Sequence, residues 1–285
     1  MNDGEQINES GRAPARDAAI RWTALVAGVV AAAVLTVGCT VSGDVAQPPR
    51  GSGGVPQTQR PGVAFVSDDG RIVVSQMRQM SVIIDTPAGT IYTDPTGGVG
   101  PYAGRPAPDV VLVSHEHAEN YDAETLEELA GPDTLLVVPP YVRDRLPAGL
   151  RADAVTLANG ERSENGGITI EAIPAYGLGG EAERWHPRGR GNGYVVTIDN
   201  RRIYVAGSTE AIPEMLELKD IYLAFLPLYP PYALGPGEAV KAVAAMVPEY
   251  TYLYQYNSEA TREEFVRGLE ESPAESVIIA PDITS

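Results

Sequence analysis

The chain has 285 residues, of which 44% are hydrophobic and 21% are charged, and its formal net charge is −17. This composition is that of a globular protein with enough chain for one large domain and a sizeable core. The acidic surface repels phosphate backbones, which argues against nucleic acid as a partner. The single cysteine excludes a disulfide framework and a cysteine-rich zinc site.

The N-terminal segment has the pattern of an export signal. Three arginines precede an uncharged run from Trp22 to Gly38, which ends in small residues directly before Cys39. A cysteine at this place is typical of the lipidation site of a bacterial lipoprotein. An uncleaved membrane anchor is the alternative, because about seventeen apolar residues just span a bilayer. In both cases we expect the protein at the cell membrane, lipid-anchored or single-pass, with its bulk on the extracytoplasmic side.

The composition changes after this leader and predicts three parts of the chain. Residues 1–39 are the leader or anchor, and residues 40–60, rich in Gly, Pro, Ser and Gln, are a flexible linker. Residues 61–285 form the folded domain. Short β-branched runs bounded by turn residues predict its strands, at 72–75, 81–85, 90–93, 109–114, 135–138, 154–157, 168–174, 194–198, 202–206, 221–226, 251–254 and 276–280.

Apolar residues at helical spacing predict helices at 122–130, 211–218, 236–246 and 259–269. Asp199 and Asn200 are expected to form a two-residue hairpin turn between two strands. Meandering strands come first, and strands alternating with helices follow. This order predicts an α+β fold in which two mixed sheets pack face to face with helices outside, a four-layer αββα sandwich.

The strand at 109–114 leads into a His-x-His motif, Ser114-His115-Glu116-His117. Side chains two residues apart on an extended backbone point the same way, so His115 and His117 aim their rings at one spot. Two ligands of one metal ion need this arrangement. The alternative is that the pair caps a strand and faces solvent, because short motifs often occur without function.

Five segments resemble, in the same order, those of the metallo-β-lactamase superfamily, and most of all the branch of ascorbate-6-phosphate lactonase-like proteins. These segments are residues 91–95, 114–117, 186–194, 203–210 and 224–227. The resemblance implies the αββα fold over about residues 63–280. It also implies a hydrolase in which two metal ions activate a water molecule and polarise the scissile bond.

Carried over residue by residue, the resemblance implies a depleted metal centre. His115 and His117 match the family's motif, and Glu119 stands where the family has Asp. The other ligand positions of the family fall on weak donors, namely Asn120, Gly177, Ser208 and Gln255. Two imidazoles and one carboxylate predict at most one ion, zinc or manganese, held by His115, His117 and Glu119, or none. Asp85, Asp94 and Asp122 remain open as substitute ligands.

A second group of residues is expected beside the site. His186, Arg188 and Arg190 lie with Arg184 in a loop rich in Pro and Gly, which the resemblance places at the mouth of the active site. Guanidinium groups bind phosphate or carboxylate through paired hydrogen bonds, so this loop is a candidate for binding a substrate anion. A solvated loop is the alternative.

Two functions follow. The first is a membrane-anchored pseudoenzyme with a depleted centre that binds metal weakly or not at all, and the sequence favours it because neutral side chains replace strong ligands. The second is a mononuclear metal-dependent hydrolase of a small anionic ester, lactone or phosphoester. In that case Glu119 acts as ligand or general base, and Arg188 and Arg190 bind the substrate anion.

Overall fold

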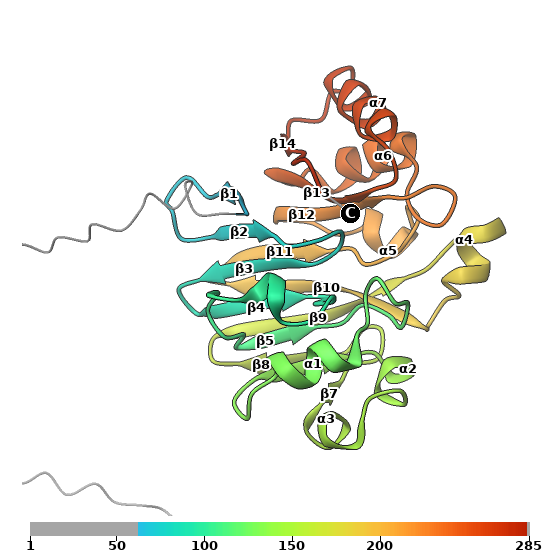
Figure 1. The fold of residues 1–285 in the computed structure, drawn as a ribbon. Helices are drawn as coiled ribbons and strands as arrows, with labels where there is room; N and C mark the ends of the chain where they lie inside the picture. Colours follow the sequence, from blue (N-terminus) through green and yellow to red (C-terminus); the bar gives the residue numbers. More distant parts are fainter. Residues whose placement is uncertain (1–61, 284–285) are drawn as a thin grey trace, which may run out of the picture. The chain divides into compact units, whose positions relative to one another are not determined.

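The structure is a computed structural model that describes residues 62–283. The predicted leader at 1–39 with Cys39 and most of the predicted linker at 40–60 lie outside the described residues, and both stay predictions. None of the helices in residues 62–283 is long and apolar enough to cross a membrane. Two seven-stranded sheets form the centre of the domain (Figure 1).

The first sheet contains the strands of the N-terminal half in chain order. Its strands are β1 (Val63–Val66), β2 (Val73–Gln76), β3 (Val82–Thr86), β4 (Gly89–Thr93), β5 (Val110–Leu112), β6 (Leu135–Val138) and β7 (Val155–Thr156). Strands β1 to β4 form an antiparallel meander, and β4 to β7 run parallel. Parallel neighbours need crossover connections, which here contain most of the helices of this half.

The second sheet repeats this plan with the remaining strands. They are β8 (Arg162–Asn165), β9 (Ile168–Ala175), β10 (Gly191–Ile198), β11 (Arg201–Val205), β12 (Ile221–Leu228), β13 (Tyr250–Tyr256) and β14 (Val277–Ile279). Strands β8 to β11 are antiparallel, and β11 to β14 are parallel. Asp199 and Asn200 turn the β10–β11 hairpin with φ angles of 49° and 64°, as the sequence predicted.

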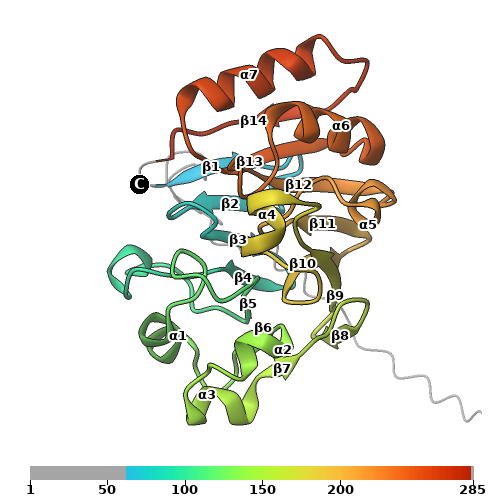
Figure 2. The ribbon, with the colours of Figure 1, turned by 90° about the vertical axis from the view of Figure 1, so that its right-hand side faces the viewer.

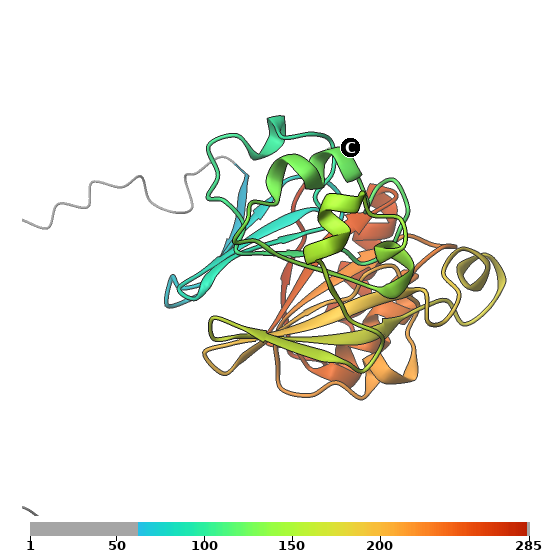
Figure 3. The ribbon, with the colours of Figure 1, turned by 90° about the horizontal axis from the view of Figure 1, so that it is seen from below.

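Helices cover the outer face of each sheet. Helices α1 (Ala123–Leu129), α2 (Pro140–Arg143) and α3 (Ala148–Asp153) pack on the first sheet, and α5 (Pro213–Leu216), α6 (Pro236–Met246) and α7 (Glu259–Glu270) on the second. The layers can be followed in Figures 2 and 3. The predicted four-layer αββα sandwich is confirmed.

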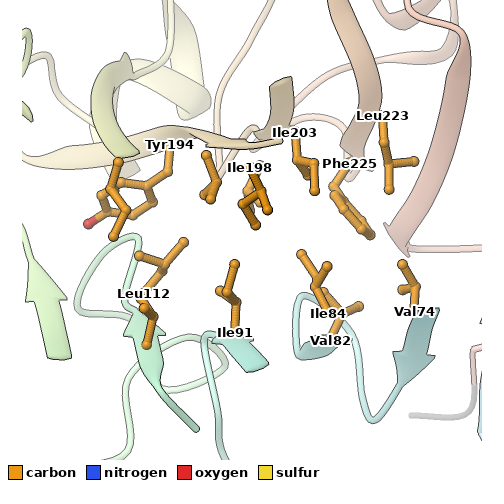
Figure 4. Packing of buried hydrophobic residues seen from close by; sticks show 14 of the residues in the cluster. Val74, Val82, Ile84, Ile91, Leu112, Tyr194, Ile198, Ile203, Leu223 and Phe225 are labelled. Carbon is orange, nitrogen blue, oxygen red and sulfur yellow. The ribbon is translucent and has the colours of Figure 1, made fainter. Parts of the chain in front are cut away.

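The main core lies between the two sheets. Figure 4 shows Ile84, Ile91 and Leu112 of the first sheet facing Ile198 and Phe225 of the second, all of them buried. Burying apolar side chains on both inner faces contributes about 1.5–3 kcal/mol for each large aliphatic or aromatic side chain. This core fixes the two sheets against each other and so brings the ends of their strands together.

Three short helices, α2, α3 and α4 (Gly180–Trp185), were not predicted. Helix α4 stands between β9 and β10 and projects beyond the strand ends (Figure 1). The sequence placed Arg184 in a loop, and this was wrong, because Arg184 lies in the last turn of α4. The loop proper begins at His186, which ends the helix. Gly and Pro residues flank α4, and in a sequence they indicate a loop, so a helix this short is not recognised.

Candidate metal centre

All three histidines of the chain meet at one place. The ring centroids of His115 and His117 lie 4.7 Å apart, and the ring of His186 lies 5.0 Å from each of them. One ligand nitrogen from each ring lies within 4.8 Å of the other two. The expected convergence of His115 and His117 is present, and a third imidazole joins them.

The turn that carries His115 is held by a buried carboxylate. Asp94, which follows β4 with a φ of 42°, accepts hydrogen bonds from the Ser114 backbone N–H (2.7 Å), the Ser114 hydroxyl (2.7 Å) and the Asn120 amide (2.9 Å). Burial raises the pKa of Asp94 to about 7, and these hydrogen bonds oppose the shift. The side-chain amide of Asn120 is thus hydrogen-bonded to Asp94, and it helps to stabilise the turn.

Two of the three imidazoles have one nitrogen hydrogen-bonded to the protein. Because the Ser114 hydroxyl donates to Asp94, it accepts from Nδ1 of His115 at 2.9 Å. Nδ1 of His186 donates to the carbonyl oxygen of Tyr232 at 2.9 Å. Nε2 of His117 lies 3.6 Å from the carboxylate of Glu116. That distance is too long for a hydrogen bond. In His115 and His186 the second nitrogen is left for a ligand, which is how metal-binding histidines are usually oriented.

Burial keeps two of these rings neutral. It lowers the pKa of His115 well below 6.5, and the neighbouring rings of His186 and His117 add to the shift. Burial also lowers the pKa of His186 to about 4, with His117 as the next contribution. A metal ion binds the neutral form of imidazole, so the site is prepared for coordination at neutral pH without losing protons first.

A glycine explains how His186 reaches the site. Gly177 follows β9 at the position where the resemblance implies a ligand. A Cβ atom on Gly177 would lie 2.1 Å from the carbonyl carbon of Ala182 in α4, so a side chain there is excluded. The backbone N–H of Gly177 donates to the carbonyl oxygen of His186 at 2.9 Å. The close approach of α4 thus leaves no room for a ligand side chain at position 177. The same helix ends at His186 and places that imidazole beside the other two.

Glu116 and Arg190 form a partly buried ion pair beside the histidines. The side chain of Glu116 is 8% exposed, and the guanidinium of Arg190 also lies over the ring of Tyr141, 4.4 Å from its centroid. Glu116 was not expected at the site, because strict alternation along an extended strand would point its side chain away from both histidines. Strand β5 ends at Leu112, so that alternation no longer applies at Glu116.

The other predicted anion-binding residue is also paired. Arg188 forms an ion pair of 2.6 Å with Glu214 and lies over the ring of Tyr176. Arg184 pairs with Glu181 on the same helix at 3.5 Å. The three arginines expected around the site therefore all have carboxylate partners within the chain.

A cavity of about 410 Å³ opens beside the histidines. It is lined by His117, Ala118, Glu119, Trp185, His186, Ser208, Tyr229, Tyr232, Ala233 and Gln255. Glu119 is exposed and is not one of the residues grouped with the three rings. Ser208 and Gln255, predicted as degenerate ligand positions, are buried in the cavity wall.

The carboxylates left open as substitute ligands serve other purposes. Asp85 accepts a hydrogen bond from the hydroxyl of Thr90. Asp122 caps α1 by accepting from the Thr125 N–H, and it also accepts from the Gly97 N–H. Among residues 62–283, the group of donors that could hold a metal ion consists of His115, His117 and His186.

The chain is similar to proteins described as metal-dependent hydrolases. A metal-dependent hydrolase from Thermococcus onnurineus is 28% identical over 184 residues, which are 61% of this chain and 79% of that protein. One from Methanopyrus kandleri is 31% identical over 187 residues, 61% of this chain and 80% of that protein. A crystal structure from Parabacteroides distasonis, described as a metal-dependent hydrolase, has a TM-score of 0.69 at 28% identity and covers 77% of this chain and 97% of its own.

A sequence model described as the beta-lactamase superfamily domain matches residues 74–252, which contain the three histidines and most strands of both sheets. This confirms the superfamily that the sequence resembled, while the ascorbate-6-phosphate lactonase-like branch stays a prediction. The chain belongs to the beta-lactamase superfamily.

Proposed function

We propose that the domain is a hydrolase that uses one divalent metal ion held by His115, His117 and His186. The observation that carries this proposal is the meeting of three imidazoles, two of which have their other nitrogen hydrogen-bonded to the protein. The relatives described as metal-dependent hydrolases support the same reaction class coarsely. The sequence predicted two imidazoles and one carboxylate as ligands, namely His115, His117 and Glu119. In the structure the third donor beside His115 and His117 is the imidazole of His186.

The donor set fits a catalytic zinc site. Three imidazole ligands with an open fourth position are one of the known catalytic zinc sets, and the nitrogens of such a set lie about 3.3 Å apart. The three rings reach this spacing with small rotations, since their nitrogens already lie within 4.8 Å of one another. A metal ion bound there would act as a Lewis acid toward the scissile bond and lower the pKa of water.

The neutral side chains around the site favour one ion over two. Asn120 is bonded to Asp94, and Ser208 and Gln255 are a hydroxyl and an amide. A second cation needs further charged donors and a bridging carboxylate to offset the repulsion between two ions. The described residues offer neither at these positions. A centre with one ion is therefore the arrangement that this set of residues supports.

The chain's own residues supply the remaining functions of a hydrolase. Glu119 lies in the cavity wall with His117 and is proposed as the group that takes up or returns a proton. Ser208 and Gln255 lie in the same wall and offer hydrogen bonds to a substrate. The alternative of a non-catalytic binding protein rests on these neutral residues at former ligand positions. The anchored position at the cell membrane remains part of either proposal.

The test begins with metal content. Protein prepared without chelator should bind about one equivalent of zinc or manganese per chain, and saturating metal should raise its melting temperature. The metal-loaded protein should hydrolyse simple chromogenic esters, and the variant His117→Ala should lose both metal and activity. An exposed change on α4, Arg184→Ala, is the matched control. One equivalent of metal without any hydrolysis would support the binding protein instead.

A further inference from the structure

The cavity beside the histidines is unusual in its charge. No lysine or arginine among residues 62–283 lines it, and its one carboxylate there is Glu119. Arg188 and Arg190, which the sequence offered as an anion clamp, do not line this cavity and are paired with Glu214 and Glu116. An anionic group placed away from the metal position would thus meet a carboxylate and no free cation. Moving such a charge out of water without a partner is costly.

Beyond this carboxylate, the cavity wall is aromatic. Trp185 and Tyr232 are large side chains that stay 47% and 37% exposed at the cavity. The ring of Trp185 meets those of His117 and Tyr232 edge to face, with centroids 5.6 Å and 6.2 Å apart. Tyr229 continues the wall, 6.2 Å from Tyr232. Exposed aromatic side chains gathered in a hollow commonly mark a ligand site, where they pack against a flat apolar group.

An amide in the wall has an unused hydrogen-bonding atom. Gln255 is 5% exposed, and among residues 62–283 its Oε1 has no hydrogen-bond partner. Leaving a buried polar atom unpaired costs about 1–3 kcal/mol, which a ligand would recover once the amide turns this atom toward the cavity. Rotation about the last side-chain bond lets the amide offer either its oxygen or its nitrogen. The Gln255 amide can therefore form a hydrogen bond with an uncharged ligand group that contains an N–H or a carbonyl.

From these three observations we propose that the site takes an uncharged aromatic ester or amide, whose neutral polar group is bound by Gln255 and whose ring packs on Trp185 and Tyr232. This deepens the proposed function and rests on it for the reaction. Hydrolysis adds the hydroxyl of one water to the acyl carbon, the acyl C–O or C–N bond breaks, and the remaining proton goes to the leaving alcohol or amine. The expected anionic substrate is replaced by a neutral one.

Two adjoining hollows do not alter this argument. One, of about 10 Å³, contains Arg190 together with its ion-pair partner Glu116, so it offers no net positive charge. The other, of about 520 Å³, shares Glu119, Tyr229 and Gln255 with the main cavity and contains Arg78. Asp122 lines it as well, so its two carboxylates outnumber the one arginine. An anion therefore gains no net positive field there.

The test compares two ligands of the same shape and different charge. Benzamide and benzoate are titrated by calorimetry into the full-length chain kept metal-free with chelator, so that no metal can attract the carboxylate. Benzamide should bind at least about tenfold more tightly than benzoate, which corresponds to about 1.4 kcal/mol. Gln255→Ala should weaken benzamide binding about tenfold. Gln76→Ala, a glutamine on β2 outside this cavity, should change nothing.

The results separate the two proposals. Equal or tighter binding of benzoate, benzamide binding that is insensitive to Gln255→Ala, or no binding of either compound at millimolar concentration would overturn the neutral-substrate proposal. These titrations contain no metal, so they stand even if the chain proves inactive. With metal added, hydrolysis of phenyl acetate should exceed that of phenyl phosphate. A loaded protein inactive on both, which still prefers benzamide, would overturn the hydrolase proposal alone.

Discussion

The ring of His186 lies 5.0 Å from that of His117, although the two residues follow strands of different sheets. His117 comes after β5 in the first sheet, and His186 ends α4 between β9 and β10 of the second. The site is therefore complete only when the two sheets are packed together. Contacts near the site hold this packing, since the Tyr194 hydroxyl donates to the carbonyl of Val113 at 2.7 Å.

The first prediction distinguishes the two possible third ligands. His186→Ala should lower zinc affinity more than about 100-fold, because loss of a ligand exceeds the 10–100-fold cost of losing a residue that orients one. Glu119→Gln should keep about one equivalent of zinc and lose hydrolytic activity, since it leaves the three imidazoles in place. Competition titration with a chromogenic chelator measures both affinities. Loss of zinc in Glu119→Gln with retention in His186→Ala would restore the ligand set expected from sequence.

The sequence was sufficient for most of the fold. Helix α6 has the predicted bounds, and the β10–β11 turn has the predicted residues, because buried β-branched runs, a proline at a helix start and a two-residue turn are local signals. The pairing of His115 with His117 was equally local. These elements and the histidine pair all depend on residues that are close together in the chain, so a single sequence is enough to predict them.

The third imidazole of the site could not be predicted because its place depends on packing between distant segments. His186 reaches the site because the backbone of α4 lies against Gly177, at a distance that only glycine permits. The resemblance assigned the ligand to position 177, and no local pattern connects that glycine to a histidine beyond the helix. One signal was present: a chain with three histidines, two of them in a metal motif, invites the question of where the third one goes.

The second prediction concerns the support of His115. Ser114→Ala removes the hydroxyl that joins Asp94 to Nδ1 of His115, so zinc affinity should fall about 10–100-fold. The loss of a buried partner should also lower the free energy of unfolding by about 1–3 kcal/mol. Ser81→Ala is the matched control, because that serine is equally buried and bonded to Tyr102 at 2.7 Å, away from the histidines. Equal zinc affinities in the two variants would show that the Ser114 hydroxyl does not orient His115.

The third prediction is a pH dependence of the metal-free protein. The pKa of His186 is about 4 in the folded state, below its ordinary 6.5, so the unfolded state binds the extra proton first as pH falls. Stability from this group is present above pH 6.5 and is lost as pH falls toward 4. Between pH 6.5 and 5 the loss should be about 2 kcal/mol.

The variant His186→Asn isolates this effect, because an asparagine amide can still donate to the Tyr232 carbonyl but does not titrate. Urea unfolding at several pH values should show a smaller loss for the variant. Asp94 changes stability in the opposite direction: with a folded pKa of about 7, raised above 3.8, it makes the protein less stable as pH rises between these values. Asp94 is present in both proteins, so its contribution cancels when the unfolding free energies of wild type and variant are subtracted at each pH. Parallel pH profiles for the two proteins would contradict a buried neutral His186.

The fourth prediction compares two arginine–glutamate pairs that differ in burial. Arg190 is 28% exposed and pairs with the buried Glu116, whereas Arg188 is 69% exposed and pairs with Glu214, whose side chain is 27% exposed. Removing one partner of a buried pair leaves an uncompensated charge and costs about 3–5 kcal/mol, while an exposed pair contributes at most about 1 kcal/mol. Arg190→Gln should therefore lower the free energy of unfolding several-fold more than Arg188→Gln.

The double variant Glu116→Gln/Arg190→Gln completes this comparison. Removing both charges leaves no unpaired carboxylate, so it should recover most of the stability lost in Arg190→Gln. Chemical unfolding of the four proteins measures this, and equal losses for Arg190→Gln and Arg188→Gln would rule out a structural role for the partly buried pair. Arg190 would then be free to contact a substrate anion, as the sequence first indicated. A recovery in the double variant instead assigns Arg190 to Glu116, whose carboxylate lies 3.6 Å from Nε2 of His117.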